Sequence, residues 1–323
     1  MASGIEHRGW SKRCQRLIVD LGAEESFDRA SKQMKEHHGV EVCASMVAST
    51  TLKHAKRAQQ LLDTLPNTKR SGNITTPLVL EMDGGMVPLV ETSGCGDRRK
   101  SRRTFWAELK VGVVQRLGEM DWKYTCTLGS PNDLGDRMLI LLETRFGWEG
   151  ESELYGVGDG ATWIAEQMER LAGVRGNYLI DLYHLSEYLA EAATAWSANV
   201  KKETRGLKDR LKKGQIAGVM RKLRKYSQVY PEHEGIRKCM QYISNRPGQF
   251  KYDEAIEKGL PIGSGKVEST HRHLIQKRLK KAGAWWRRDH AELMASLRTL
   301  RANDDWERLW QGYAASESIY MAA

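Results

Sequence analysis

The chain has 323 residues, enough for about two domains of roughly 150 residues, and its net charge of +10 favours a polyanionic partner, with an ordinary basic enzyme as the alternative. The five cysteines are scattered and form no CxxC pair, which argues against a disulfide framework or a zinc site and suits a reducing cytosol. The start lacks the apolar core of a signal peptide, and no stretch approaches the ~18 apolar residues of a membrane-spanning helix, so we expect a cytoplasmic protein without a membrane partner.

The first part of the chain predicts helices. Apolar residues recur at helical spacing over 17–34, Ser26 suits a helix N-cap, and Gly39 suits a helix end. Residues 43–62 continue the helical pattern. We therefore expect residues 1–72 to form a helical DNA-binding domain that resembles a helix-turn-helix, with an ordinary helical hairpin as the alternative.

From residue 73 the apolar pattern changes to a period of two. Residues 78–82 and 87–89 predict two strands joined by a glycine turn, which would place Asp83 at the end of the first strand. Further strands are expected over 105–117 and 122–128, with a charged loop over 97–103.

Helices and strands then alternate. The pattern predicts a helix from Pro131 to about Phe146, a strand ending at Asp159, a helix over 161–171, a strand over 178–181 and a helix over 182–196. Strands first, followed by this alternation, is the order of an α/β protein with a ribonuclease-H-like mixed sheet.

The remaining chain is expected to divide that core. Residues 197–250 predict a basic helical insertion, so the ribonuclease-H-like catalytic core would comprise 73–196 and 251–303. Ser264 is expected to cap a helix that runs to about Lys281, and another helix is expected over 289–301. Residues 304–323 would form a C-terminal tail.

Three short acidic motifs are candidates for chemistry. Asp83 and Asp159 each follow an apolar, strand-like run and precede a glycine, and Glu268 lies near the start of a helix. Mg²⁺ prefers oxygen ligands, and two metal ions about 3.5–4 Å apart stabilise the attacking and leaving oxygens in phosphoryl transfer. We therefore predict catalytic metal ligands at Asp83, Asp159 and Glu268, with Mg²⁺ as cofactor and Mn²⁺ as its substitute.

Each motif also has a structural alternative. Asp-Gly is a common turn dipeptide, and a glutamate near a helix N-terminus is favourable electrostatically. The order of the three motifs, with a basic insertion before the last one, favours the catalytic interpretation.

A family resemblance rests on four segments: MDGG at Asp83, GDGA at Asp159, Asp181-Leu-Tyr-His184, and GSGKVES at Glu268. Over about residues 20–300 the chain resembles bacterial insertion-sequence DDE transposases of the Kra-type group within the Mutator-like lineage. The resemblance implies metal-dependent strand cleavage and strand transfer at the ends of an insertion sequence. It also implies double-stranded DNA partners (terminal repeats and target DNA), a bacterial, nucleoid-associated location when bound, and a homodimer or larger homo-oligomer.

The segment from Asp181 to His184 resembles a further signature of this lineage. His184 is a candidate catalytic residue that would orient a phosphate, relay a proton or brace the site. The alternative is that Asp181 and His184 hydrogen-bond each other at a strand–helix junction. One departure from some transposases is Ile275, seven residues after the glutamate, where they have Lys or Arg.

Two segments are candidate DNA contacts. Between residues 201 and 225 there are eleven Lys or Arg against Glu203 and Asp209, and such a run contacts phosphates without reading sequence. The second segment, residues 277–288, mixes Lys and Arg with tryptophan. Trp285 or Trp286 would stack on a base flipped out near the cleavage point, with core packing as the alternative. The candidates are Lys201, Lys202, Lys212, Lys213, Arg221, Lys222, Arg224, Lys225, Lys277, Arg278, Trp285 and Trp286. A third basic patch is expected over 98–103.

The sequence thus favours a DDE-type DNA transposase. The alternative is a catalytically inactive, domesticated transposase-derived protein that binds DNA. An aspartic protease is disfavoured, because its motifs usually have Thr or Ser between Asp and Gly and its chemistry gives no role to the basic insertion.

Overall fold

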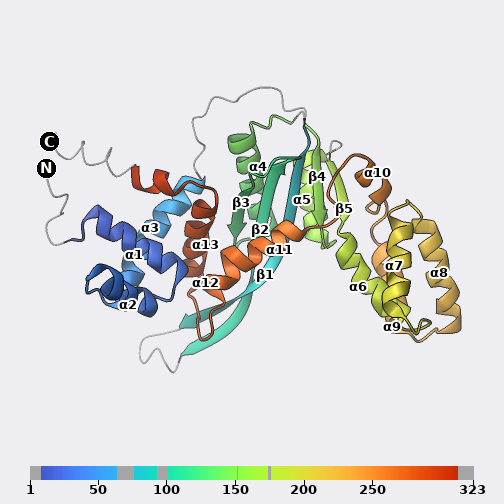
Figure 1. Ribbon diagram of the computed structural model, residues 1–323, viewed down its shortest axis with the longest axis horizontal. Coiled ribbons are helices and arrows are strands. Elements are labelled where there is room, and N and C mark those ends of the chain that lie inside the picture. Colours follow the sequence, from blue (N-terminus) through green and yellow to red (C-terminus); the bar gives the residue numbers. More distant parts are fainter. Residues whose placement is uncertain (1–8, 64–75, 93–100, 151, 174–175, 312–323) are drawn as a thin grey trace.

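The computed structural model describes residues 9–63, 76–92, 101–150, 152–173 and 176–311. Its centre is one five-stranded mixed sheet with strand order β3-β2-β1-β4-β5 (Figure 1). Strands β1, β2 and β3 are antiparallel neighbours, whereas β4 and β5 run parallel to β1. The strands are β1 Leu78–Thr92, β2 Arg102–Arg116, β3 Lys123–Thr127, β4 Leu154–Gly158 and β5 Gly176–Ile180.

Strand β1 differs from its prediction. It is continuous, so the glycine turn was wrong and Asp83 lies within the strand. Gly84 and Gly85 pair with Lys110 and Leu109 of β2, and neither has a positive φ. A Cβ on Gly84 would lie 2.1 Å from an oxygen of the Glu108 side chain. The glycines therefore leave room for neighbouring side chains and do not reverse the chain.

The predicted N-terminal helices are confirmed as α1 Lys12–Glu24, α2 Phe27–His38 and α3 Ala44–Asp63. Ser26 caps α2 through the Arg29 N–H, and Gly39 ends it with a φ of 65°. These helices do not have a wholly separate core. Alanines and a valine of α1 and α3 pack with the long strands and with the C-terminal helix α13 Arg288–Ala302.

Helices cover both faces of the sheet. On one face, α4 Pro131–Phe146 and α5 Thr162–Ala172 pack on Leu80 and Met82 of β1. On the other face, β5 leads into α6 Leu182–Ala193, whose apolar side joins the core of the insertion. The insertion is helical, as expected, and comprises α7 Val200–Leu211, α8 Ile216–Val229 and α9 Glu234–Ser244, followed by α10 Tyr252–Glu257.

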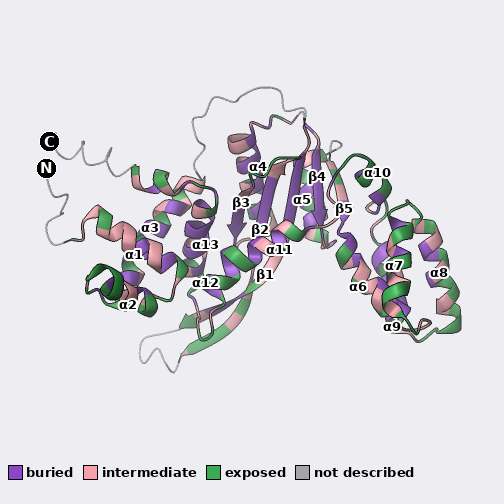
Figure 2. Ribbon diagram, in the orientation of Figure 1, coloured by how far each residue is buried: buried purple, intermediate pink, exposed green. Residues whose placement is uncertain are grey.

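The insertion and the N-terminal helices lie at opposite ends of the molecule, with the sheet between them (Figure 1). The strands are largely buried, whereas the outer faces of α7 and α8 are exposed (Figure 2). Across the described ranges, we find no helix with the length and apolar character needed to cross a bilayer.

The helix predicted after Ser264 has three consecutive parts: α11 Gly265–Thr270, a π-helix His271–Gln276 and α12 Lys277–Leu279. The predicted cap was wrong, because the Ser264 side chain makes no capping bond to this helix. It donates instead to Asp181, which lies at the start of α6. Helices α11 and α12 cross the face of the sheet near β1 (Figure 1).

Candidate active site

Two of the predicted carboxylates lie on or beside neighbouring parallel strands: Asp83 is within β1, and Asp159 is one residue past the end of β4. Glu81 of β1 is opposite Val157 of β4. Asp83 and Asp159 each follow their member of that pair by two residues. Because side chains alternate between the faces of a strand, this register directs both aspartates to the same face, at adjacent positions. That face also carries Val79 and Val157, which belong to the core shared with α6.

The two aspartates influence each other electrostatically. The pKa of Asp83 is raised from 3.8 to about 6, chiefly by burial, with the negative charges of Asp159 and Glu108 contributing and the Gly84 N–H opposing the shift. That N–H donates to Asp83 Oδ1 at 2.7 Å, and the Ala161 N–H donates to Asp159 Oδ1 at 2.8 Å. The pair is thus held in place by local backbone, and its mutual repulsion is of the kind that a bound cation relieves.

Helix α11 and the π-helix run alongside β1. The Val267 N–H donates to Glu81 Oε2 at 2.8 Å, and His271 Nε2 lies 3.4 Å from Asp83 Oδ2. Two residues of strand span about 6.6 Å and four residues of helix about 6.0 Å. The spacing of the two contacts along the helix therefore matches their spacing along the strand. Because both contacts follow the chain order in each element, the helix and β1 run in the same direction.

Glu268 lies within the helix between these two contacts, but its side chain is exposed. It lines a cavity of about 270 Å³ together with five residues. Glu268 precedes His271 by three residues, so the two side chains are neighbours on the helix surface. The other lining residues are Asp181, Tyr183, Ile262, Gly263 and Gly265.

Sequence reasoning missed Glu81 and His271. Burial raises the pKa of Glu81 from 4.5 to about 7 and lowers the pKa of the His271 imidazole. Glu81 had a usable signal, because it precedes Asp83 by two residues and so shares its face of the strand. The only sequence signal for His271 was its position about one helical turn after Glu268. Its partner, Asp83, is distant in sequence.

Replacing Gly85 with Ala is expected to destabilise the protein by about 1–3 kcal/mol, because overpacking of a buried contact is costly. A Cβ on Gly85 would lie 2.6 Å from Nδ1 of His271, whose ring is buried. Gly206→Ala is the control, since nothing lies within 4 Å of its Cβ position in α7. Urea denaturation tests this, and a Gly85→Ala variant as stable as the wild type would contradict the packing described.

The donor set of the two aspartates suits a hard cation. Among the residues that the structure describes, no three His, Cys, Asp or Glu side chains are grouped so as to hold a metal ion. Asp83 and Asp159 supply carboxylate oxygens at adjacent positions, which is the ligand type that Mg²⁺ prefers. Glu268 is exposed on α11, the helix that runs alongside β1, and lines the cavity that contains Asp181.

Asp181 has a structural task in this arrangement. Its Oδ1 accepts from the N–H groups of Tyr183 and His184 at 2.6 and 3.2 Å, and its Oδ2 accepts from Ser264. The bond between Asp181 and His184, which was the alternative to a catalytic role, thus involves the histidine backbone. The His184 ring lies 5.6 Å from that of Tyr188 between ring centroids, and its charge lowers the pKa of Asp83.

The candidate DNA contacts divide into exposed and buried residues. Arg278 is 2% exposed and lies over the rings of Phe27 and Trp286, and Trp286 is 7% exposed. These two residues are core packing, so they are removed from the predicted DNA contacts. Trp285 is half-buried, and Lys222 pairs with Glu203. The exposed candidates are Lys201, Lys202, Lys212, Lys213, Arg221, Arg224, Lys225 and Lys277.

Within the third basic patch, residues 98–100 lie outside the described residues, whereas Arg102 and Arg103 belong to β2 and are exposed. Strand β2 therefore begins at Arg102, before the predicted end of the loop over 97–103.

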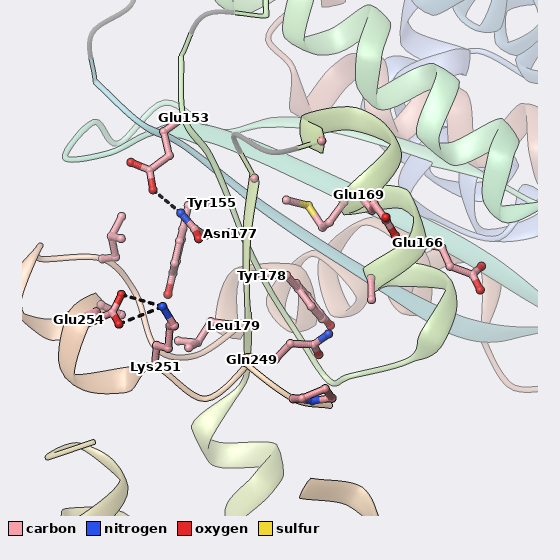
Figure 3. A pocket seen from close by; sticks show the side chains of 18 of the residues that line it. Glu153, Tyr155, Glu166, Glu169, Asn177, Tyr178, Leu179, Gln249, Lys251 and Glu254 are labelled. Carbon is pink, nitrogen blue, oxygen red and sulfur yellow. Dashed lines mark hydrogen bonds and ion pairs between the residues drawn. The ribbon is translucent and has the colours of Figure 1, made fainter. Parts of the chain in front are cut away.

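A groove of about 420 Å³ follows the outer edge of β5 between α5 and α10 (Figure 3). Its walls include Tyr178 and the ion-paired Lys251 and Glu254. None of the three predicted catalytic carboxylates lines it. Tyr178 connects the groove to the site, because its hydroxyl accepts the Gly160 N–H at 3.1 Å beside Asp159.

The fold and the paired aspartates define a mixed α/β protein with an acidic site at the middle of its sheet. A model of the Uncharacterised protein family (UPF0236) matches residues 6–309, and the chain belongs to this family.

Relatives were found in Caldanaerobacter subterraneus subsp. tengcongensis. The UPF0236 protein TTE2489 is 26% identical over 293 residues, which cover 88% of this chain and 58% of that protein. A second relative, whose name joins eleven locus designations, is 24% identical over 301 residues, which cover 92% of this chain and 60% of that protein. The chain thus spans a little over half the length of these relatives.

Among solved structures, the Drosophila P element transposase strand transfer complex aligns with 96% of this chain and 83% of that chain. The TM-score is 0.35 and the sequence identity is 12%. A likeness of this size supports no inference about fold or function.

Proposed function

We propose that this protein is a DDE-type DNA transposase that cleaves and transfers DNA strands by metal-dependent phosphoryl transfer. The observation that carries the proposal is the proximity of Asp83, within β1, and Asp159, just past the end of the neighbouring parallel strand β4, where the charge of Asp159 raises the pKa of Asp83. A ribonuclease-H-like core is part of the proposal. The order of three antiparallel strands followed by two parallel ones agrees with it.

Asp83, Asp159 and Glu268 would hold Mg²⁺, which Mn²⁺ can replace. When bound, the metal stabilises charge on the phosphate oxygens and promotes ionisation of an attacking water or 3′-hydroxyl. The protein's own residues orient these ligands. Backbone N–H groups fix the two aspartates, and His271 contacts Asp83 from the helix.

DNA binding would use exposed basic surfaces. The exposed Lys and Arg of α7 and α8 are suited to phosphate contacts. Helix α3 presents an exposed stripe that includes Ser49, Lys53 and Lys56, which suits a helix that enters a groove. Two ends of an element must be brought together, so we propose a homodimer or larger assembly acting in the bacterial cytoplasm.

The relative whose name joins eleven locus designations also supports a mobile element, because a protein encoded at many loci of one genome is typical of one. By extension, we propose that the gene of this chain is or was part of an insertion sequence.

The experiment is cleavage of DNA that contains the sequences flanking the gene. Purified protein is expected to nick or cut this DNA in Mg²⁺ or Mn²⁺, and to make no cuts when EDTA removes the metal. Tight binding without cleavage at any metal concentration would identify the catalytically inactive, domesticated DNA-binding alternative. Absence of both binding and cleavage would reject the proposal.

Metal binding should also be measurable as a change in the stability of the folded protein. The raised pKa of Asp83 means that its charge destabilises the folded state, so the contribution of Asp83 to stability is most favourable below about pH 4 and is lost as pH rises through about 6. This partly buried charge costs at most about 3 kcal/mol at pH 7.5. Asp83→Asn should therefore raise the free energy of unfolding at pH 7.5 by about 1–3 kcal/mol, with the gain disappearing near pH 4.

Thermal denaturation with and without Mg²⁺ tests this prediction. The cation should raise the melting temperature of the wild type at pH 7.5 and leave that of Asp83→Asn unchanged. Asp209→Asn, an exposed position in α7, is the control for the change in charge. Equal Mg²⁺ effects on all three proteins would place the binding elsewhere.

A further inference from the structure

The start of α11 is held by carboxylates from other parts of the chain. An α-helix leaves its first four N–H groups without partners inside the helix, and α11 has no side-chain cap of its own. The Val267 N–H donates to Glu81 Oε2 at 2.8 Å. Both the N–H and the Oγ–H of Ser264 donate to Asp181 Oδ2 at 2.7 Å. Carboxylates from β1 and from the β5–α6 junction therefore fix where this helix begins.

These bonds are buried. Glu81 is 3% exposed, Asp181 2%, Ser264 5% and Val267 1%. Water therefore cannot readily replace a lost partner, and removal of either carboxylate would leave buried donors unsatisfied. Through its other oxygen, Asp181 also accepts two N–H groups at the start of α6, so one side chain joins the starts of two helices.

Glu268 depends on this anchoring. Its exposed side chain makes no hydrogen bond or ion pair with the rest of the described chain, whereas the preceding residue, Val267, is bonded to Glu81. The position of Glu268 is therefore set by the backbone of α11 and not by contacts of its own.

We propose that Glu81 and Asp181 are positioning residues, which hold α11 so that Glu268 faces the Asp83–Asp159 pair. The catalytic part of this inference rests on the proposed function, and the anchoring of the helix does not. Glu81 acts through its acceptor oxygen, so an uncharged acceptor can replace it. A metal ligand at the same place would need the negative charge.

Two substitutions of Glu81 separate these roles. Glu81→Gln keeps a side-chain carbonyl to accept the Val267 N–H, whereas Glu81→Leu removes the acceptor and keeps a similar volume. Asp181→Asn offers only one acceptor oxygen, so it loses at least one of its bonds to Ser264 or to α6. Glu91→Gln, at an exposed end of β1, is the control for loss of one charge.

Hydrogen exchange measured by mass spectrometry over residues 262–275 tests the anchoring without any DNA. Glu81→Leu and Asp181→Asn are expected to exchange at least about 10-fold faster than the wild type in this segment. Glu81→Gln and Glu91→Gln should exchange within about threefold of the wild type. Unchanged exchange in Glu81→Leu would overturn the anchoring role.

The same proteins are then compared in metal-dependent cleavage. Glu81→Gln should keep its cleavage rate within about threefold, whereas Glu81→Leu should lose about 100-fold in rate with unchanged DNA affinity. A Glu81→Gln variant with normal exchange but no cleavage would show that Glu81 takes part in the reaction itself. If wild-type protein does not cleave DNA, the proposed function fails, while the exchange result still decides whether the two carboxylates anchor α11.

Discussion

Asp83→Ala is expected to lower the rate of DNA strand cleavage by about 1,000-fold or more, while DNA affinity stays within about threefold. Asp83 is close enough to Asp159 for their charges to interact at the site proposed to hold the metal, so its loss would remove a ligand at the reacting phosphate. The residue is away from the exposed basic helices α7 and α8, which are proposed to carry most of the phosphate contacts. Cleavage of labelled DNA and its binding by fluorescence anisotropy are to be measured on the same preparation.

Glu91→Ala is the matched control, because it removes a carboxylate from the exposed end of the same strand. It should cleave at the wild-type rate. If Asp83→Ala also cleaved at the wild-type rate in Mg²⁺, Asp83 would not be a metal ligand. If Asp83→Ala lost binding and cleavage together, its effect would be on folding or on the DNA surface.

The second large effect concerns the insertion. Conversion of four exposed cations of α8 and of the turn between α7 and α8 to Gln is expected to weaken DNA binding by about 100-fold or more near 0.1 M salt. If each contacts one phosphate, the slope of log affinity against log salt should decrease by about 3.6, since each contact contributes about 0.9. The four residues are Lys212, Lys213, Arg224 and Lys225.

The control changes the same net charge elsewhere. It converts four exposed lysines of α2 and of the segment around α10 to Gln: Lys32, Lys35, Lys251 and Lys258. A general effect of net charge would weaken binding equally in both variants. Equal losses would therefore contradict a DNA-binding role for the insertion, whereas a loss confined to the α7–α8 variant would support it.

Most elements could be predicted from the sequence because their signals are local. The helix from Pro131 to Phe146 carries its own start and stop, with a capping box at Ser130 and a left-handed Gly147. Likewise, alternation of apolar residues marked the start of β1, and short apolar runs marked β4 and β5.

The predictions that failed depend on contacts between distant residues. The Gly84-Gly85 pair is a turn signal locally, but Glu108 and His271 need the space that these glycines leave. Ser264 is a typical helix cap, yet its hydroxyl bonds Asp181, 83 positions earlier. Glu81 and Val267 are 186 positions apart. A single sequence contains no local pattern that reports such pairings.

The same reasoning explains the tryptophan pair. Trp285 and Trp286 are adjacent in sequence, but their environments differ. The backbone of Trp286 bonds β1 at Pro88 and Val90, and its ring is buried. Trp285 remains half-buried, with its ring 6.2 Å from that of the exposed Trp106 between centroids. The sequence shows that two tryptophans are adjacent here, but it does not show which of the two rings is accessible.

The most direct measurement of the central claim is a crystal structure of the protein soaked with Mn²⁺, with the metal located by anomalous scattering. We expect an anomalous peak between the carboxylates of Asp83 and Asp159, with Glu268 turned toward it, and no such peak in crystals of Asp83→Asn. Manganese bound only at other residues, with both aspartates and Glu268 lacking metal contacts at saturating concentration, would contradict the account.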